Sequence, residues 1–136
     1  MVPENEAVVR RFMEEVWSEG QLSVADELVA ADHLHHLGDD TLRGPDGIKE
    51  AATWLRTAFP DLRFEVDDLI SDGDRVVLRW TARGTHRGTF ADVAPTGRHV
   101  AWTGCDWFRL RSGRLVEAFV LADGGALYDQ LTSTEP

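Results

Sequence analysis

The sequence predicts a single α+β domain in which three N-terminal helices pack on a strongly curved antiparallel sheet. Apolar residues recur at helical spacing in the first 60 residues, and from residue 62 onward they alternate with polar ones, as in half-buried strands. The chain has 136 residues, of which 43% are hydrophobic, so residues 1–136 suit one domain with a sizeable core. Because such a sheet must bury one face, we expect the helices to cover it.

Three segments carry the helical pattern, namely residues 5–18, 22–30 and 44–59. The first has an apolar stripe that includes Val16, and such stripes usually pack in a core. Val16 is also a candidate for the wall of a binding cavity. The third segment begins with Gly44 and Pro45, where proline is tolerated in the first helical turn, and it carries Trp54 at the edge of its stripe.

A cluster of histidines follows the second predicted helix, at His33, His35 and His36. In an extended segment His33 and His35 point to one side and His36 to the other. Three interpretations are open: a metal site, partly solvated structural histidines, or an acid or base supplied to a pocket by His35. A zinc site needs a third protein ligand in tetrahedral geometry, and the sequence offers no motif for one.

The rest of the chain reads as antiparallel strands joined by short turns. In the second of them Trp80 lies on the apolar face, and His86 falls on the same face by parity. A connection containing a short extended stretch at 88–90 then leads to a hairpin. The predicted long strands cover residues 62–70, 75–86, 100–111 and 115–123, and a short C-terminal segment follows.

The hairpin at residues 100–123 organises the fold, because its pairing can be read from the sequence. If the loop at 112–114 brings Arg111 opposite Leu115, facing residues sum to 226. Trp107 then faces Phe119 and Arg109 faces Glu117 on one side of the sheet, an aromatic pair and an ion pair.

The even-numbered side of this hairpin is apolar except for one carboxylate, Asp106. Its neighbours on that side include Trp102, Phe108 and Val120. An acid surrounded by aromatic and aliphatic side chains is typical of a ligand pocket, so we expect the even side to be functional. Three tryptophans that line one cavity, Trp54, Trp80 and Trp102, would favour a flat aromatic substrate through stacking.

Charge and composition exclude several classes of partner. The net charge of -10 argues against nucleic acid and against anionic membrane surfaces. No apolar run approaches the ~20 residues of a membrane span. A lone cysteine, Cys105, provides neither an internal disulfide nor a paired-cysteine metal motif. We expect a cytoplasmic protein that acts on a hydrophobic small molecule.

Six short motifs in order resemble the SnoaL-like polyketide cyclases and predicted ester cyclases of the NTF2-like superfamily, over roughly residues 6–131. The motifs are Gly44-Pro45-Asp46-Gly47-Ile48, Phe59-Pro60-Asp61-Leu62, Asp72-Gly73-Asp74-Arg75-Val76-Val77, Gly84-Thr85-His86-Arg87-Gly88, Ala94-Pro95-Thr96-Gly97-Arg98, and Phe108-Arg109 with Gly113-Arg114-Leu115-Val116-Glu117. The resemblance implies a cone-shaped fold and ring closure by an intramolecular aldol step, without a metal or an organic cofactor. It also implies a homodimer through the outer sheet face, with Trp107 and Phe119 in the interface.

The resemblance further implies which positions form the pocket. The family aspartate that removes the proton falls on Val120, which cannot accept one. The family's pocket asparagine falls on His35, and a pocket histidine falls on Asp106. We therefore expect Asp106 to be the catalytic base with His35 as its polar partner, and Trp102, Phe108, Val120, His86, Trp80, Trp54 and Val16 to contact the substrate.

Two other classes of function remain open from the sequence. One is a binder of hydrophobic ligands, or an inactive relative, that keeps the cavity without a base. The other is an isomerase or epoxide hydrolase built on the same fold, because one fold hosts many reactions.

Overall fold

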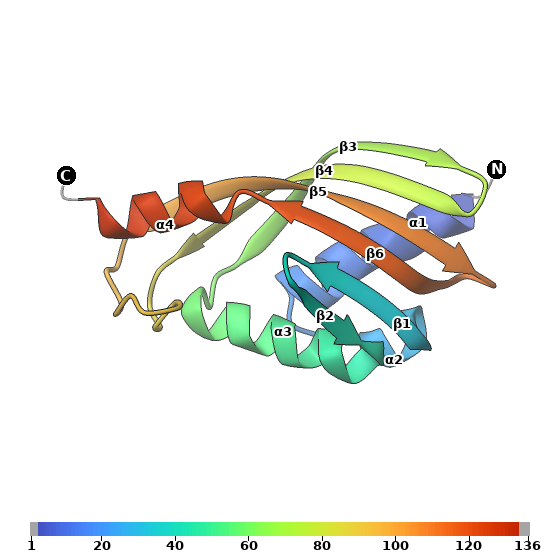
Figure 1. The fold of residues 1–136 in the computed structure, drawn as a ribbon, viewed down its shortest axis with the longest axis horizontal. Helices are drawn as coiled ribbons and strands as arrows, with labels where there is room; N and C mark the ends of the chain where they lie inside the picture. The colour runs from blue at the N-terminus through green and yellow to red at the C-terminus, as the bar shows by residue number, and fades with distance from the viewer. Residues whose placement is uncertain (1–2, 134–136) are drawn as a thin grey trace.

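The computed structural model describes residues 3–133, which form helices laid against one face of a curved, six-stranded sheet (Figure 1). The N-terminal half contains α1 (Pro3–Arg11), the π-helix η1 (Phe12–Ser18), α2 (Val24–Leu28), β1 (Val29–Leu37), β2 (Asp40–Arg43) and α3 (Gly44–Ala58). The C-terminal half contains β3 (Arg63–Asp72), β4 (Arg75–Thr85), β5 (His99–Arg111), β6 (Arg114–Ala122) and α4 (Gly124–Thr132). The predicted α+β class is confirmed, with four α-helices and a π-helix among the described residues in place of three helices.

The sheet is mixed, which corrects the antiparallel sheet expected from the sequence. Its strand order is β2-β1-β6-β5-β4-β3, and β1 pairs with β6 in parallel while every other neighbouring pair in this order is antiparallel. Alternation within a strand reports which side chains are buried but not the direction of the neighbouring strand. The histidine segment thus becomes a strand next to β6, which brings His35 opposite Ala118.

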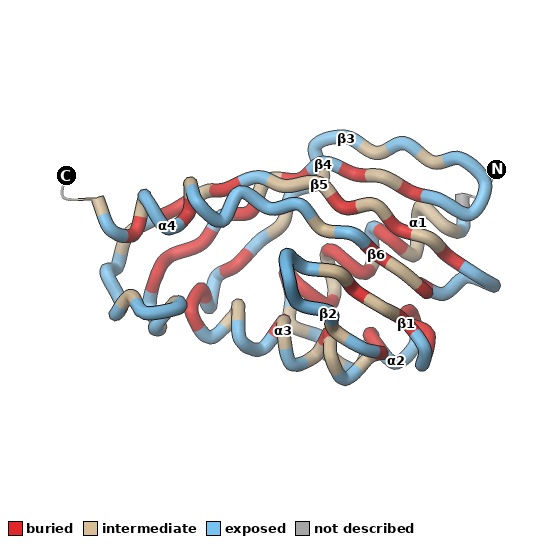
Figure 2. Tube along the Cα trace, in the orientation of Figure 1, coloured by how far each residue is buried: buried red, intermediate tan, exposed pale blue. Residues whose placement is uncertain are grey.

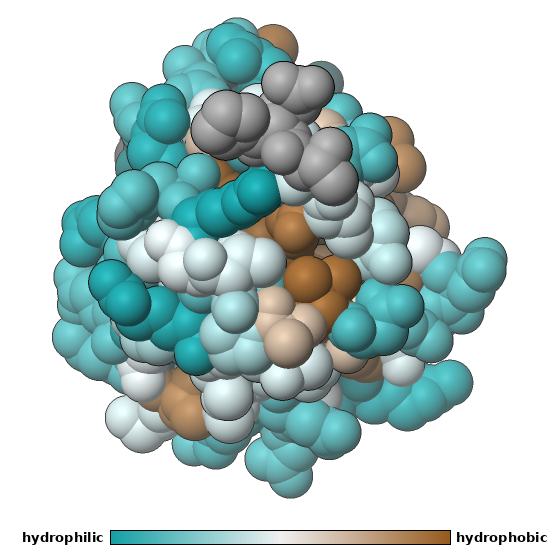
Figure 3. Space-filling model, turned by 90° about the vertical axis from the view of Figure 1, so that its left-hand side faces the viewer, coloured by the Kyte–Doolittle hydropathy of each residue, from teal (hydrophilic) through white to brown (hydrophobic). Residues whose placement is uncertain are grey.

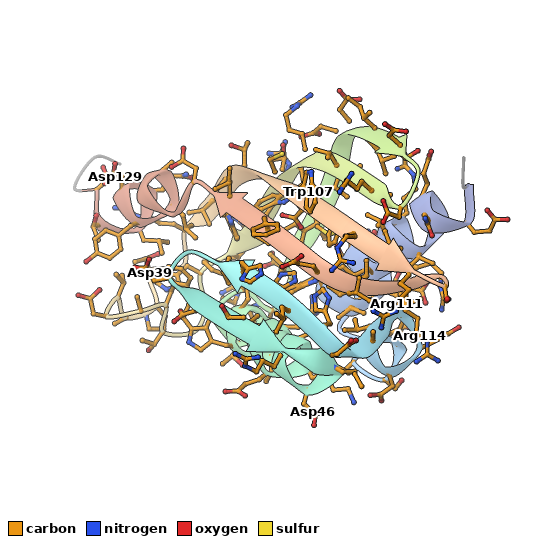
Figure 4. All side chains as sticks on the ribbon, turned by 45° about the vertical axis from the view of Figure 1, so that its right-hand side comes forward. Asp39, Asp46, Trp107, Arg111, Arg114 and Asp129 are labelled. Atoms are coloured by element: carbon orange, nitrogen blue, oxygen red, sulfur yellow. The ribbon has the colours of Figure 1, made fainter. Side chains whose placement is uncertain are left out.

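The predicted register of the β5–β6 hairpin is confirmed over most of its length. Asp106 pairs with Val120, Trp107 with Phe119, and Arg109 with Glu117. The register changes at the tip, where Arg111 pairs with Arg114 instead of Leu115, and both arginines lie together at the end of the hairpin (Figure 4).

The change at the tip comes from a two-residue turn. Ser112 and Gly113 both have positive φ, 53° and 75°, as a type I′ turn requires. The register then shifts between the pairs Arg109–Glu117 and Leu110–Leu115, where β6 has one residue more than β5. At this irregularity the consecutive residues Leu115 and Val116 are both buried.

The core lies between the inner sheet face and the helices, as the buried stretches in Figure 2 show. Arg56 on α3 ties the end of η1 to the start of β3, because its guanidinium donates to the carbonyl oxygens of Trp17, Ser18, Pro60 and Leu62. This arrangement fixes the end of η1, from which Trp17 reaches the interior.

Several predicted boundaries change. The second helix ends at Leu28 rather than at residue 30, because β1 begins at Val29. The predicted stretch at 88–90 is reduced to one bridge between Phe90 and Val93. The C-terminal segment is a helix, α4, capped by Asp123, whose carboxylate accepts from the backbone N–H of Ala126. No helix among residues 3–133 is long and apolar enough to cross a membrane.

Candidate active site

A cavity of about 230 Å³ lies between the helices and the inner face of the sheet. Its walls come from η1, α3, α4 and the facing strands, and they are almost entirely apolar. The lining residues are Met13, Trp17, His35, Leu37, Ala51, Trp54, Leu55, Phe64, Trp80, Phe90, Trp102, Asp106, Val120, Ala122, Gly124 and Leu127. At the end of the molecule where α3 and α4 approach each other, apolar side chains gather within a rim of polar ones (Figure 3). The cavity suits a hydrophobic small molecule.

Asp106 is the acidic group of this cavity. It projects from β5 on the same face as Val120, and only 4% of it is exposed. Burial raises the pKa of its carboxyl group to about 7, and the hydrogen bond from Nε1 of Trp80 to Oδ1, 2.9 Å long, opposes that rise. A carboxyl group with a pKa near neutrality can give or take a proton at physiological pH, which a general acid or base requires.

His35 brings a second polar group to the cavity from β1. Its ring packs near Trp17 with an interplanar angle of 27°, and its Nδ1 lies 3.2 Å from Nε2 of His33. Burial lowers the pKa of His35 to about 3, so the ring is neutral at pH 7. His35 and Asp106 line the same cavity, but among the described residues no hydrogen bond joins them directly.

The third histidine of the cluster, His36, points to the opposite side of the sheet, as the alternation predicts. Its Nε2 lies 2.9 Å from Oε2 of Glu117, and its ring stacks on Phe119 at 4.5 Å. Glu117 also forms the predicted ion pair with Arg109, at 3.4 Å. These contacts place His36 and Glu117 outside the cavity.

The structure brings some of the predicted ligand contacts to the cavity and not others. Trp54, Trp80, Trp102 and Val120 line it, and Trp54, which is 54% exposed, lies against Phe90. Three residues predicted to contact the substrate lie outside this lining, namely Val16, His86 and Phe108.

Each of the three exceptions has a physical reason. Phe108 lies nearer the hairpin tip than Asp106 on the same face, where it packs against Phe12 at 5.8 Å. Val16 is fully buried on η1, whose π-helical winding departs from the 3.6-residue pattern, and Met13 and Trp17 line the cavity instead. His86 follows the end of β4, and its Nδ1 accepts from the backbone N–H of Thr96.

The sequence did not predict several of the lining residues, because the structural elements that carry them differ from the predicted ones. Leu127 lies on α4, which was not predicted as a helix. Phe90 lies in a connection without a long strand. Trp17 follows Val16 on η1, and it lines the cavity where Val16 does not. The sequence carried no separate signal for Leu127 or Phe90 as cavity residues.

Metal ligation was one of the open interpretations of the histidine cluster. Within residues 3–133 no three or more His, Cys, Asp or Glu side chains come together in a group that could hold a metal ion. His33 and His35 face each other instead, and His36 lies on the other side of the sheet.

A curved sheet wrapped around helices and an apolar cavity is the NTF2-like architecture. The family model of the SnoaL-like polyketide cyclases matches residues 7–131. The chain therefore belongs to the SnoaL-like polyketide cyclase family.

Solved structures of similar chains agree with this assignment. IdmH from Streptomyces antibioticus, a proposed polyketide cyclase, is 31% identical, with coverage of 93% of this chain and 97% of that chain and a TM-score of 0.82. A proposed polyketide cyclase from Acidithiobacillus ferrooxidans is 30% identical, with 99% of both chains covered and a TM-score of 0.86. AclR from Streptomyces galilaeus, a proposed hydroxylase, is 29% identical, with 100% and 87% covered and a TM-score of 0.86. A search of curated protein sequences found no match.

Proposed function

We propose that the protein closes a ring in a hydrophobic, polyketide-like small molecule by an intramolecular aldol reaction, with Asp106 as the base. The observation that carries the proposal is the position of Asp106: a carboxyl group buried in an apolar cavity, held through one oxygen by Trp80, with a pKa near 7. Family membership supports a cyclase reaction. The mechanism needs no metal or organic cofactor.

The reaction follows from the chemistry of one carboxylate. Ionised Asp106 takes a proton from a carbon atom between two carbonyl groups of the substrate, and the electron pair of the C–H bond delocalises as an enolate. The enolate carbon attacks another carbonyl carbon of the same molecule, which forms the new C–C bond and leaves an alkoxide. The alkoxide takes the proton back from Asp106, so substrate and product have the same atoms and the base is regenerated.

The other cavity residues hold the substrate in a reactive shape. The indoles of Trp54, Trp80 and Trp102 supply flat surfaces for an extended conjugated chain. The ring of His35 is neutral and lines the cavity, and it orients the substrate through one hydrogen bond. These contacts fold the substrate so that its reacting carbon atoms lie close together, which supplies the proximity that ring closure needs.

The test compares ring closure by the wild type and by Asp106→Asn. An aromatic polyketide methyl ester serves as substrate, and absorbance follows the new ring. We expect Asp106→Asn to lower kcat by 10²-fold or more, because a positioned base contributes about 10²–10⁴-fold. Asp39→Asn, in the exposed turn after β1, is the matched control and should keep full activity. Equal turnover by wild type and Asp106→Asn would remove Asp106 as the base.

One observation favours a second candidate, a protein that binds a hydrophobic ligand without reaction. By the family resemblance the position of the catalytic base falls on Val120, which pairs with Asp106 across the hairpin and whose side chain cannot accept a proton. A binder would take up the ester without any change in its ring system. Binding without turnover in the wild type would therefore favour this function over cyclisation.

A further inference from the structure

A second hollow, of about 540 Å³, lies where β4 ends and β5 begins, and it shares no lining residue with the cavity. Its lining includes Arg63, Arg83 and His99, although the chain as a whole carries a net charge of -10. The other lining residues are Asp61, Gly84, Val100, Ala101 and Gln130. The hollow therefore gathers two guanidinium groups and an imidazole in an acidic protein, and the proposed reaction uses none of them.

The register of the sheet sets the two arginines side by side. Arg63 on β3 is the cross-strand partner of Arg83 on β4. Residues directly opposite each other have Cβ atoms about 4.5–5.5 Å apart, and like charges in such a pair repel. Arg63 has one carboxylate partner, since its Nη2 lies 3.1 Å from Oε1 of Glu14, but Arg83 forms no ion pair or hydrogen bond through its side chain within residues 3–133. The partner of Arg83 on β5 is Ala101, which supplies no negative charge.

The carboxylate that lines the hollow, Asp61, already has partners of its own. Its Oδ1 accepts from the backbone N–H of Thr85 and its Oδ2 from the Thr85 hydroxyl, both at 2.7 Å. Burial opposes ionisation of Asp61, but these hydrogen bonds outweigh it and lower the pKa, so the carboxyl group is ionised at neutral pH. No ion pair joins Asp61 to Arg63 or Arg83. An anion from outside the chain would therefore be the partner that Arg83 lacks.

The same hydroxyl fixes a proton on His99. Nδ1 of His99 lies 2.8 Å from Oγ1 of Thr85. A hydroxyl has one proton, and that of Thr85 goes to Asp61, so Thr85 accepts from His99 and Nδ1 carries a proton. In the neutral ring Nε2 then carries a lone pair. His99 is exposed and lines the hollow, and its Nε2 forms no hydrogen bond within residues 3–133.

We propose that this hollow binds a phosphate group, with Arg83 and Arg63 donating to its oxygens and Nε2 of His99 sharing a proton with it. A phosphate ester presents three terminal oxygens, which suits groups arriving from three strands, whereas a carboxylate presents two oxygens in one plane. Phosphate also has a proton that is lost at about pH 6, so it can bring the proton that the neutral ring of His99 lacks at Nε2. Sulfate has no such proton near neutral pH, so the hollow should prefer phosphate.

Titration followed by ¹H–¹⁵N NMR tests the site with inorganic phosphate and glycerol 3-phosphate, which distinguish the free ion from an ester and have no apolar part that suits the cavity. At neutral pH and constant ionic strength, we expect saturable shifts of the His99 ring signals and of the amide signals near Arg83, with a dissociation constant of about 1 mM or below for the preferred probe. Arg83→Gln should weaken binding about tenfold. Arg114→Gln, at the hairpin tip, removes the same charge and should bind as the wild type does.

Selectivity between phosphate and sulfate tests the role of His99. We expect the wild type to bind phosphate about fivefold more tightly than sulfate, as one added hydrogen bond to a charged group predicts. In His99→Asn the side-chain amide can still donate to Thr85 in place of Nδ1, but Nε2 is gone. This variant should therefore bind the two anions equally.

Three outcomes would overturn the inference. These are the absence of a saturable shift in the wild type with either probe, equal phosphate affinity in Arg83→Gln and Arg114→Gln, and equal affinity of the wild type for phosphate and sulfate. Arg83 and His99 do not line the cavity, so both variants should close the ring at the wild-type rate. A failure here is thus distinguishable from a failure of Asp106 as the base.

Discussion

Gly104 on β5 lies directly beneath the indole ring of Trp80, its partner on β4. An ideal Cβ at residue 104 would overlap ring atom Cζ2 of the indole, so only glycine lets the ring lie against the strand. From this position Nε1 of Trp80 reaches Oδ1 of Asp106, two residues further along β5. The hydrogen bond that holds Asp106 therefore depends on the absence of a side chain at residue 104.

Gly104→Ala should displace the indole of Trp80. We expect the free energy of unfolding to fall by about 1–3 kcal/mol, because a methyl group added at a filled position forces its neighbours off their rotamers. Urea denaturation measures this change. The control is Gly125→Ala on α4, where a Cβ meets only a carboxylate oxygen at 3.8 Å and should leave stability equal or slightly higher. Wild-type stability in Gly104→Ala would contradict the close packing of Trp80 on β5.

Trp80→Phe should raise the pKa of Asp106 further above its ordinary range. The hydrogen bond from Trp80 favours the ionised carboxyl group, and its loss leaves burial unopposed. We expect an upward shift of about one pH unit, measured by ¹³C NMR of the Asp106 carboxyl carbon. Trp102→Phe, which alters another cavity wall without touching this hydrogen bond, should leave the pKa unchanged. A fall in the pKa of Asp106 in Trp80→Phe would refute the role assigned to the indole.

The placement of Asp106 could be predicted because the hairpin has few possible registers. Side-chain alternation and a short loop leave one pairing that sets Trp107 against Phe119 and Arg109 against Glu117, and that pairing puts Asp106 opposite Val120. The tip could not be predicted, because the two-residue turn needs a positive φ at Ser112, which serine rarely adopts.

The remaining walls of the cavity depend on contacts that no local pattern encodes. The parallel pairing of β1 with β6 is a long-range choice, yet it is what brings His35 to the cavity. On η1 it is Trp17 rather than Val16 that lines the cavity, and the π-helical winding of this segment is not encoded in a 3.6-residue pattern. The position of Leu127 depends on how α4 packs against β5, a contact between elements that no local pattern shows.

We propose that a second copy of the chain covers the outer face of the sheet. Trp107 points away from the cavity on this face (Figure 4) and packs against Phe119 at 5.4 Å. The ladder continues this row through Val77 to Ile70, and Ile70 is 66% exposed. An apolar row across several strands is typical of a surface that a partner buries.

Sedimentation at micromolar concentration tests this interface, and we expect a dimer. Phe119→Asp and Ile70→Asp should each shift the chain toward monomer, because a charge would be buried without a partner. Tyr128→Asp, at a partly exposed aromatic residue on α4 away from this row, should leave the dimer intact. A monomeric wild type, or variants that dimerise as well as it does, would exclude this face as the interface.

The raised pKa of Asp106 should make its contribution to stability depend on pH in a direction opposite to that of most acids. The folded protein binds the Asp106 proton more tightly than the unfolded chain does, with a pKa of about 7 against 3.8. Its contribution is therefore fully present below pH 4 and is lost as the pH rises toward 7, where the buried group must ionise. Asp106→Asn keeps a neutral side chain at every pH and escapes this loss.

We accordingly expect the free energy of unfolding of Asp106→Asn, relative to the wild type, to rise by about 2 kcal/mol between pH 5.5 and pH 8. His33 and His35, whose pKa values are lowered, act with the opposite sign below pH 6.5, but they are present in both proteins and cancel in the difference. Urea denaturation at both pH values provides the measurement, with Asp39→Asn as the exposed control. If the difference in the free energy of unfolding between Asp106→Asn and the wild type stays constant with pH, Asp106 is ionised in the folded protein at pH 5.5. The pKa of Asp106 would then not lie near neutral pH, and the argument for Asp106 as the base would fail.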